Sequence, residues 1–235
     1  MVPIDRKRRI ALYGGTFDPI HLGHLEVARK VSRLFEIDEL WFVLAQVAPH
    51  KLLRDVTPAL HRYAMLALAT QDEPLLLIST FELDGPDRRY TVDTLAHFKS
   101  ELNDSAELFF IMGADSWSEI TSWREWDRLL GMANHIVVSR PGYELAVTHI
   151  RPDLASRIAD LRGINKSHAA EIIQSRAGER IFITDAVMTD VSATDVRRAV
   201  RENSGELTSM VPPPVADYIR KYGLYRDLNE RQFDG

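Results

Sequence analysis

Short apolar runs alternate with amphipathic segments along the chain. Runs rich in β-branched and aromatic residues predict buried strands at residues 9–15, 39–46, 75–80, 107–113, 135–140 and 180–185. Apolar residues at helical spacing predict helices at residues 24–35, 59–70, 91–102, 126–133, 192–203 and 215–223. Uninterrupted apolar strands that alternate with helices are typical of a parallel sheet covered on both faces. We therefore predict an α/β fold, a Rossmann-like doubly wound parallel sheet with C-terminal helices.

Residues 143–180 show the least regular pattern. We expect short helices and loops there, inserted before the strand at 180–185. The sequence has no internal repeat, no low-complexity tract and no linker rich in Pro, Gly and Ser. With 235 residues it is long enough for one sizeable core. We therefore expect residues 1–235 to form a single domain.

The composition narrows the class of partner. The formal net charge is −5, from 29 basic and 34 acidic residues, which argues against a dedicated nucleic-acid-binding protein but leaves room for a local basic pocket. The sequence has no cysteine, so disulfides and thiolate metal sites are excluded and a cytoplasmic location is the simplest expectation. No apolar run approaches the ~18 residues of a membrane span, and we expect no membrane partner. The oligomeric state stays open, and a homo-oligomer is compatible with the sequence.

The segment ALYGGTFDPIHLGHLEVARKV, which begins at Ala11, carries the main chemical signal. Gly14 and Gly15 let the main chain turn tightly and approach a ligand closely. The next helix is expected to begin near Leu22, where free N–H groups and the positive end of the helix dipole suit an anion. Ligands of open parallel sheets bind beyond the carboxyl ends of the strands, and this turn follows such an end.

His21 and His24 stand at the start of that helix, one turn apart, so that both rings can face one point. Imidazoles donate hydrogen bonds to phosphate oxygens, and a bound phosphate raises their pKa so that they can do so as cations. Isolated histidines at a helix start are more often surface or capping residues, and a zinc site would favour an i, i+4 pair with further ligands. The glycine turn beside the pair favours a phosphate site, although its spacing is not that of the dinucleotide motif G-x-G-x-x-G.

A second phosphate-binding element is predicted at residues 191–197. Ser192 precedes a helical pattern, Thr194 lies in its first turn, and Arg197 adds a forked cation. The spacing from Ser192 to Asp195 also matches a capping box with Asp in place of Glu, which is a purely structural alternative. Together with the first element, this helix start would hold one triphosphate from the opposite side.

The sequence GGTFDPIHLGH resembles the phosphate-binding signature of nucleotidyltransferases with the H-x-G-H motif. Among these enzymes, its residues closely resemble those of the bacterial nicotinate-nucleotide adenylyltransferases. The similarity extends over nearly the whole chain, to APHK at 48–51, YTVDTL at 90–95, MGADS at 112–116, SRPG at 139–142, VSATDVR at 191–197 and YGLYR at 222–226. It implies that ATP and nicotinate mononucleotide give nicotinate adenine dinucleotide and pyrophosphate, with Mg²⁺, in NAD biosynthesis. The family usually has Ile-Ser-Ser-Thr where this chain has Val-Ser-Ala-Thr, so one hydroxyl is missing at Ala193.

The residues and the resemblance together predict roles on the ATP side. His21 and His24 are the expected catalytic residues, holding the α- and β-phosphates. Thr194 and Arg197 are expected to hold the outgoing pyrophosphate, and Asp115 to accept hydrogen bonds from a ribose. The predicted ATP-binding set is Gly14, Gly15, Thr16, Phe17, Gly113, Asp115, Ser192, Thr194 and Arg197.

On the acceptor side, the resemblance points to Tyr90, Thr91 and Trp123, with the indole stacked on the pyridine ring. Thr91 is also a candidate cap for the helix at 91–102. Lys51, beside His50 in a polar loop, is predicted to meet the mononucleotide phosphate, with ordinary surface charge as the alternative. Asp18 precedes Pro19 and is at least as well explained as a turn residue, so no side chain is assigned to Mg²⁺.

Other readings of the same motif stay open. Sister enzymes use phosphopantetheine, nicotinamide mononucleotide or FMN as the acceptor, and the length and later motifs favour nicotinate mononucleotide. A class I aminoacyl-tRNA synthetase fragment would need a lysine-rich second signature and an anticodon-binding domain, and neither is seen. A non-catalytic nucleotide sensor would have no need of both His21 and His24.

Overall fold

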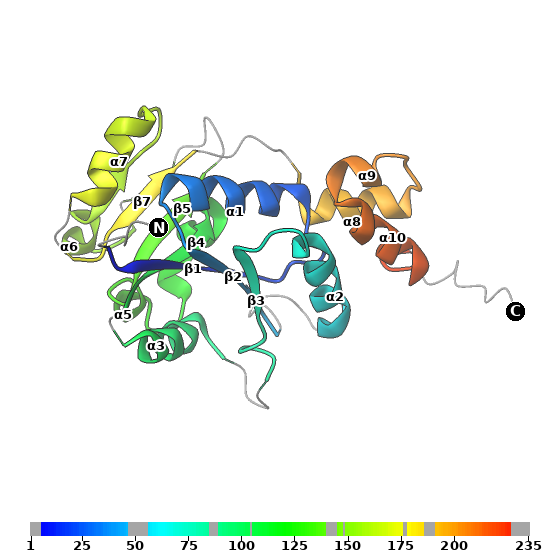
Figure 1. Cartoon of the computed structure of the whole chain (residues 1–235), viewed down its shortest axis with the longest axis horizontal. Coiled ribbons are helices and arrows are strands. Elements are labelled where there is room, and N and C mark those ends of the chain that lie inside the picture. Colours follow the sequence, from blue (N-terminus) through cyan, green and yellow to red (C-terminus); the bar gives the residue numbers. More distant parts are fainter. Residues whose placement is uncertain are drawn as a thin grey trace, which may run out of the picture.

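The computed structural model describes residues 6–46, 56–84, 89–103, 105–139, 145–147, 149–175, 178–185 and 191–226. Within them, one seven-stranded sheet has the order β3-β2-β1-β4-β5-β7-β6, and all its pairings are parallel (Figure 1). The strands are β1 (Arg8–Gly15), β2 (Glu39–Leu44), β3 (Leu76–Ser79), β4 (Ala106–Gly113), β5 (Asn134–Val138), β6 (Ile158–Asp160) and β7 (Ile181–Thr184). The predicted doubly wound α/β fold is confirmed.

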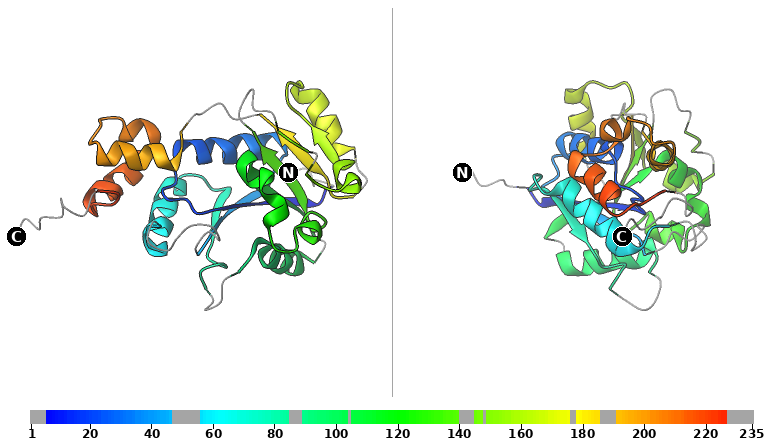
Figure 2. Two further views of the ribbon diagram at one scale, coloured as in Figure 1. Left: turned by 180° about the vertical axis from the view of Figure 1, so that it is seen from behind. Right: turned by 90° about the vertical axis from the view of Figure 1, so that its right-hand side faces the viewer.

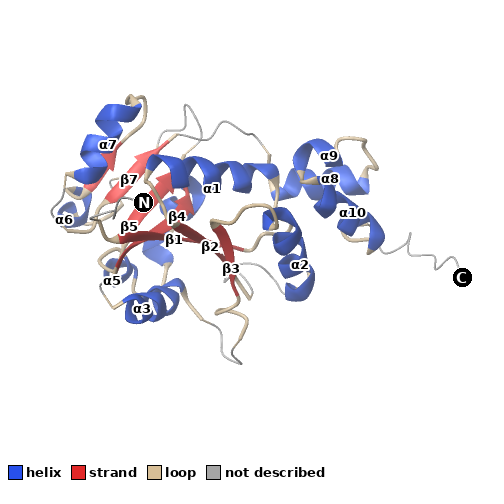
Figure 3. Cartoon of the chain, in the orientation of Figure 1, coloured by secondary structure: helices blue, strands red, loops and turns tan. Residues whose placement is uncertain are grey.

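Helices cover both faces of the sheet (Figure 3). One face carries α1 (Leu22–Leu34) and α7 (Lys166–Gln174), and the other carries α3 (Thr91–Leu102), α4 (Ala114–Ser118) and α5 (Trp126–Leu129). The other helices are α2 (Ala59–Thr70), η2 (Ile120–Ser122), α6 (Pro152–Ala155), α8 (Ala193–Arg201), α9 (Leu207–Met210) and α10 (Pro213–Lys221). None of the described helices is long and apolar enough to cross a membrane.

Strand β1 explains why the core has two layers. Successive side chains of a strand point to opposite faces, so Ala11 packs with Leu25 of α1 while Ile10 and Leu12 pack in the cluster that contains Leu95 of α3. The side chains of all these residues are buried. A strand that is apolar on both faces can lie only inside a sheet covered on both sides, which places the segment after β1 at the centre of the molecule.

The structure changes some of the predicted bounds. Residues 143–180 hold the short strand β6 as well as α6 and α7, and the sequence pattern did not predict that strand. The helix predicted at 126–133 ends at Leu129, and the last helix begins earlier than predicted, at Pro213. Proline fits the first turn of a helix because its missing N–H has no acceptor there in any case.

The strand order places the functional edge of the sheet. The chain runs outward from β1 to β2 and β3 on one side and from β4 to β5 on the other, so a crevice is expected beyond the carboxyl ends of β1 and β4. Helices α8, α9 and α10 lie past this end of the sheet (Figure 1), and a view from that side shows them in front of it (Figure 2). Segments from the two ends of the sequence therefore meet at this edge.

Candidate active site

The glycine turn closes tightly on itself at the end of β1. Phe17 has a left-handed φ of 46° and folds its buried ring under the turn. A Cβ atom on Gly15 would lie 2.7 Å from that ring, closer than any side chain can approach, so only glycine fits. The carbonyl of the next residue, Thr16, accepts a hydrogen bond from Arg62 Nη1 at 2.7 Å. The turn therefore packs on the ring of Phe17 and is hydrogen-bonded to the guanidinium of Arg62.

His21 and His24 lie together at the start of α1, as predicted. His21 is the N-cap residue, and the two rings are stacked with their centroids 3.6 Å apart. The rings of Tyr13 and Phe17 meet His24 edge-on at centroid distances of 6.0 and 5.1 Å. Burial, and then the positive charge of His21, lowers the pKa of His24 well below its ordinary value. His24 is thus a neutral imidazole at pH 7, and its cationic form requires an anion beside it.

Gly23 brings the two predicted phosphate-binding elements together. A Cβ atom there would lie 3.2 Å from the carbonyl oxygen of Val191 and 3.0 Å from Nδ1 of His21. The segment that leads into α8 therefore passes directly over the first turn of α1. This close packing favours glycine at the centre of H-x-G-H, a role that the sequence interpretation did not assign.

The first turn of α8 is capped by its own side chains. Ser192 Oγ accepts a hydrogen bond from the N–H of Asp195 at 3.1 Å, and the Asp195 carboxylate accepts the N–H of Ser192 at 3.2 Å. The capping box considered from the sequence is therefore present. Arg197 donates to the carbonyl of Asp18 at 2.6 Å and to Thr194 Oγ1 at 3.2 Å. Arg197 thus bridges α8 and the turn that precedes His21.

A cavity of about 470 Å³ opens at the carboxyl ends of β1 and β4. Its lining includes Gly14, Gly15 and Thr16 of the glycine turn together with Tyr90, Thr91 and Trp123. The structure therefore brings together three of the four predicted acceptor-binding residues and the first part of the predicted ATP-binding set. The volume lies within the usual range of small-molecule pockets.

Each of the acceptor-side residues Tyr90, Thr91 and Trp123 is held by a helix start or by a ring contact. Tyr90, and not Thr91, is the N-cap residue of α3, and its N–H is bonded to the carboxylate of Asp93 at 3.0 Å, so the expected cap at Thr91 is corrected by one residue. The guanidinium of Arg124 lies 4.9 Å above the Tyr90 ring. The indole of Trp123 meets the ring of Phe110 edge-on at 6.4 Å.

The remaining predicted residues lie at the margin of the cavity or outside the described residues. Gly113 is the last residue of β4 and the N-cap of α4, and no atom lies within 4 Å of where its Cβ would be. Asp115 is exposed in the first turn of α4, next to the cavity residue Ser116. Lys51 and His50 fall outside the described residues.

Comparisons with known proteins agree with this geometry. The cytidylyltransferase-like family profile matches residues 12–199. A probable nicotinate-nucleotide adenylyltransferase of Thermoanaerobacter sp. (strain X514) is 37% identical over 227 residues, which is 97% of this chain and 99% of the relative. Another, of Mycolicibacterium vanbaalenii, is 37% identical over 225 residues, 96% of this chain and 95% of the relative. The chain belongs to the nicotinate-nucleotide adenylyltransferase family.

A solved structure extends the comparison to three dimensions. The Plasmodium falciparum nicotinic acid mononucleotide adenylyltransferase complexed with NaAD superposes with a TM-score of 0.68 and 22% identity, over 93% of this chain and 97% of that one. The two proteins share a fold. The resemblance seen in the sequence motifs is confirmed, and the chain is a nucleotidyltransferase of this family.

The sequence interpretation missed one supporting residue of this adenylyltransferase, Arg62 on α2. Its side chain is fully buried and donates to the carbonyl oxygens of Thr57, Thr16, Ala45 and Gln46 at 2.8, 2.7, 2.9 and 3.0 Å. A signal was present in the sequence, because residue 62 lies on the buried helical stripe that continues with apolar residues at 65, 66 and 69. A charged side chain in a buried stripe indicates that its polar atoms have hydrogen-bond partners inside the protein.

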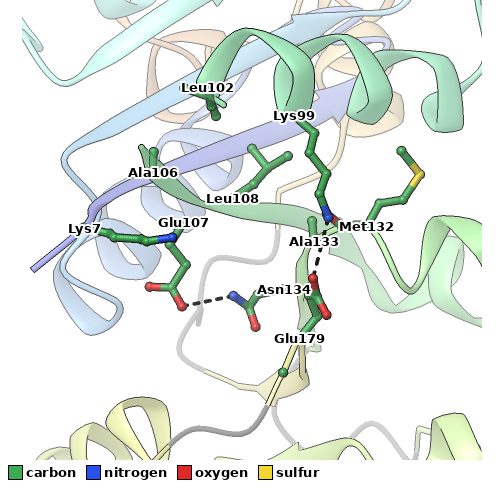
Figure 4. Close-up of a pocket in the computed structure, with 11 residues that line it drawn as sticks. Lys7, Lys99, Leu102, Ala106, Glu107, Leu108, Met132, Ala133, Asn134 and Glu179 are labelled. Atoms are coloured by element: carbon green, nitrogen blue, oxygen red, sulfur yellow. Dashed lines mark hydrogen bonds and ion pairs between the residues drawn. The ribbon is translucent and has the colours of Figure 1, made fainter. Parts of the chain in front are cut away.

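A second cavity, of about 250 Å³, lies at the amino ends of the strands and away from the glycine turn (Figure 4). In it, Asn134 Nδ2 donates to Glu107 Oε1 at 3.2 Å, and the ammonium of Lys99 lies 3.6 Å from a carboxylate oxygen of Glu179. This cavity shares no lining residue with the one at the glycine turn.

Proposed function

We propose that this protein transfers the adenylyl group of ATP to nicotinate mononucleotide, releasing pyrophosphate and forming nicotinate adenine dinucleotide for NAD biosynthesis. The observation that carries the proposal is the match of nearly the whole chain to probable nicotinate-nucleotide adenylyltransferases, with the H-x-G-H residues seated on the glycine turn. The substrates are metabolites of the cytoplasm, where we expect the protein to act.

On the ATP side, we assign the triphosphate to the space between the starts of α1 and α8. His21 and His24 hold the α- and β-phosphates from one side, and Thr194 and Arg197 hold the leaving pyrophosphate from the other. The contact between Gly23 and Val191 supports this arrangement, because it fixes the two helix starts next to each other. Gly113 and Asp115 extend the site towards the ribose.

The reaction is an in-line displacement at phosphorus. A phosphate oxygen of the mononucleotide attacks the α-phosphorus of ATP, an oxygen–phosphorus bond forms, and the bond to pyrophosphate breaks. The nucleophile is already an anion near neutral pH, so the site needs no general base. Its work is to align two anions against their repulsion and to stabilise the charge that develops on the α-phosphate and the leaving group.

On the acceptor side, we assign nicotinate mononucleotide to the 470 Å³ cavity. Trp123 would stack on the pyridine ring, while Tyr90 and Thr91 at the start of α3 would meet its carboxylate. Arg89 and Arg124 line this cavity together with Glu82 and Glu119, so we assign the preference for an acidic ring over a neutral amide to the start of α3 rather than to the net charge of the wall. Lys51 is assigned to the mononucleotide phosphate.

Mg²⁺ is assigned to the substrate, as the MgATP complex. Among the described residues no group of three or more His, Cys, Asp or Glu side chains could hold a metal ion. The carboxylate oxygens of Asp18 already accept hydrogen bonds from Tyr225 and from the N–H of Thr57. The phosphates of ATP are therefore the ligands that we expect to bring the ion.

Steady-state pyrophosphate release with ATP and a panel of acceptors tests the proposal. The panel contains nicotinate mononucleotide, nicotinamide mononucleotide, phosphopantetheine and FMN. We expect the highest kcat/KM with nicotinate mononucleotide, and Trp123→Ala should weaken both pyridine nucleotides without changing their ratio. Equal efficiency for the acid and the amide, or a preference for another acceptor, would overturn the assignment of the substrate.

A further inference from the structure

The segment that follows α10 turns back towards the glycine turn. The helix ends in a Schellman motif, in which Leu224 N–H bonds to the carbonyl of Ile219 at 3.1 Å and Gly223 N–H bonds to that of Arg220 at 3.3 Å. Gly223 supplies the left-handed φ of 57° that this motif requires. Leu224 then packs against the core cluster beside α1. The direction of the chain after the helix is therefore fixed by main-chain bonds and by burial.

Tyr225 is the first residue after this helix-ending turn. It too has a left-handed φ, of 66°, which residues with side chains rarely adopt. Its hydroxyl donates to Asp18 Oδ1 at 2.7 Å. Burial, and then the charge of Asp18, raises the pKa of Tyr225, so the hydroxyl remains protonated and able to donate at neutral pH.

Asp18 connects Tyr225 to the phosphate-binding residues. Its side chain is 4% exposed, and its second carboxylate oxygen accepts the N–H of Thr57 at 3.0 Å. Its carbonyl oxygen accepts the 2.6 Å hydrogen bond from Arg197, and it lies three residues before His21. Asp18 therefore accepts hydrogen bonds from three residues that lie 207, 179 and 39 positions away along the chain.

We propose that Tyr225 is a positioning residue for adenylyl transfer: its hydrogen bond to Asp18 holds the turn in the geometry that places Arg197 and His21 on the phosphates of ATP. Tyr225 does not line the 470 Å³ cavity assigned to the acceptor, and it reaches the phosphate-binding residues through Asp18. The inference rests on the proposed function only for the identity of ATP as a ligand. It assigns an active-site role to the segment after α10, through one hydroxyl group.

The chain offers a matched control in Tyr222, which lies on the same turn. Its side chain is 50% exposed and contacts the rings of His61 and Tyr218, away from Asp18. Tyr225→Phe and Tyr222→Phe each remove one hydroxyl group and keep the aromatic ring. The two variants therefore separate the bond to Asp18 from a general effect of altering this turn.

The experiment measures ATP dissociation constants by calorimetry, kcat and KM values, and melting temperatures for both variants. For Tyr225→Phe we expect ATP affinity to fall about fivefold, the factor that corresponds to one lost hydrogen bond, while KM for the acceptor changes less than about twofold. Tyr222→Phe should match the wild type. A lower melting temperature for Tyr225→Phe with unchanged ATP affinity and kcat would overturn the proposal, because Tyr225 would then only stabilise the fold.

A double-mutant cycle with Arg197→Ala sharpens the test. If Tyr225 acts through the turn that holds Arg197, Tyr225→Phe should change ATP affinity by less than about twofold once Arg197 is absent. Equal effects in both backgrounds would contradict that route. ATP binding is measured without an acceptor, so an error in the proposed acceptor would appear as absent turnover with normal ATP affinity and would leave this test intact.

Discussion

The two helix starts that face the proposed triphosphate site differ in how they are capped. Helix α1 has no side-chain hydrogen bond at its N-cap and no acidic residue in its first turn. Helix α8 has a complete capping box, and Asp195 places a negative charge in its first turn. First-turn N–H groups that no side chain accepts are available to an anion, whereas a carboxylate beside them competes for the same place. For the proposed triphosphate site, we therefore expect α1 to contribute its main chain and its histidines, and α8 to contribute mainly Arg197.

This division of labour fits the charges around α8. Asp195 also forms an ion pair with Arg198 at 2.7 Å, so its carboxylate is engaged within the helix. Arg197 points the other way and bonds to the turn at Asp18. Asp195, which caps the helix, and Arg197, which supplies the cation, therefore have different partners. Substitutions can test their effects separately.

The largest effect is expected at α1. His24→Ala should lower kcat by about 100-fold to 1000-fold, the usual loss when one preorganised donor to a transition-state charge is removed, and should leave most ATP affinity intact. Steady-state kinetics and calorimetric ATP titration measure the two quantities. The exposed His168 on α7 supplies the control, since His168→Ala should change neither. Unchanged turnover in His24→Ala would contradict the catalytic role of His24. It would also contradict the larger contribution expected from α1 than from α8.

The next effect concerns acid. The pKa of His24 is well below its ordinary value, and burial lowers the pKa of His135, on β5, to about 3. In the unfolded chain both titrate near 6.5, so below that pH the unfolded state binds more protons, and stability falls at up to about 1.4 kcal/mol per pH unit for each histidine. His24→Gln should make the slope between pH 6.5 and 4.5 in urea unfolding shallower than that of the wild type. A slope as steep as that of the wild type would show that His24 is not buried as a neutral group.

A smaller effect is expected on the α8 side. Arg197→Ala should weaken ATP and pyrophosphate together by about tenfold, the loss of one charge-assisted hydrogen bond, while acceptor binding stays nearly unchanged. Arg198→Ala, which removes the neighbouring arginine from the same helix, is the control and should leave both affinities within about twofold. Equal weakening of the acceptor would move Arg197 to the other substrate.

The smallest effect is expected for the cap itself. Ser192→Ala should cost about 1 kcal/mol of stability, the usual cost of removing an N-cap side chain, because the N–H of Asp195 loses its acceptor. Since that hydroxyl is occupied within the helix, ATP affinity should stay within about twofold. Thermal unfolding and ATP titration measure the pair of values. A loss of ATP affinity beyond that limit would support the direct contact expected from the sequence and would make the two helix starts more alike.

Much of the fold and part of the site could be predicted from local pattern. Apart from β6, each described strand contains a continuous apolar run of at least three residues, and Gly14, Gly15, His21 and His24 lie within one short segment whose spacing already implies a turn followed by a helix start. Strand β6 has only three residues, too few to show a period, and was therefore missed. The N-cap of α3 was misplaced by one residue, because the extended residue at the start of this helix is Tyr90, whose N–H donates to the Asp93 carboxylate.

The supports of the site could not be predicted, because they depend on contacts far apart in the sequence. Arg62 joins loops that follow β1 and β2, and Tyr225 reaches Asp18 across 207 residues. No periodicity or spacing relates such positions. Asp18 was interpreted as a turn residue, and the structure places it in that turn, but its three partners come from three other parts of the chain.

The bond between Arg197 and the carbonyl of Asp18 also has a consequence in time. At typical synthesis rates of about 5–20 residues per second, the 179 residues between them separate their emergence from the ribosome by about 9–36 s. During that interval the histidines and the glycine turn exist without their partner across the triphosphate. A nascent chain that has passed β1 but not α8 therefore carries the glycine turn and the H-x-G-H residues before the arginine that bonds to their turn has been made.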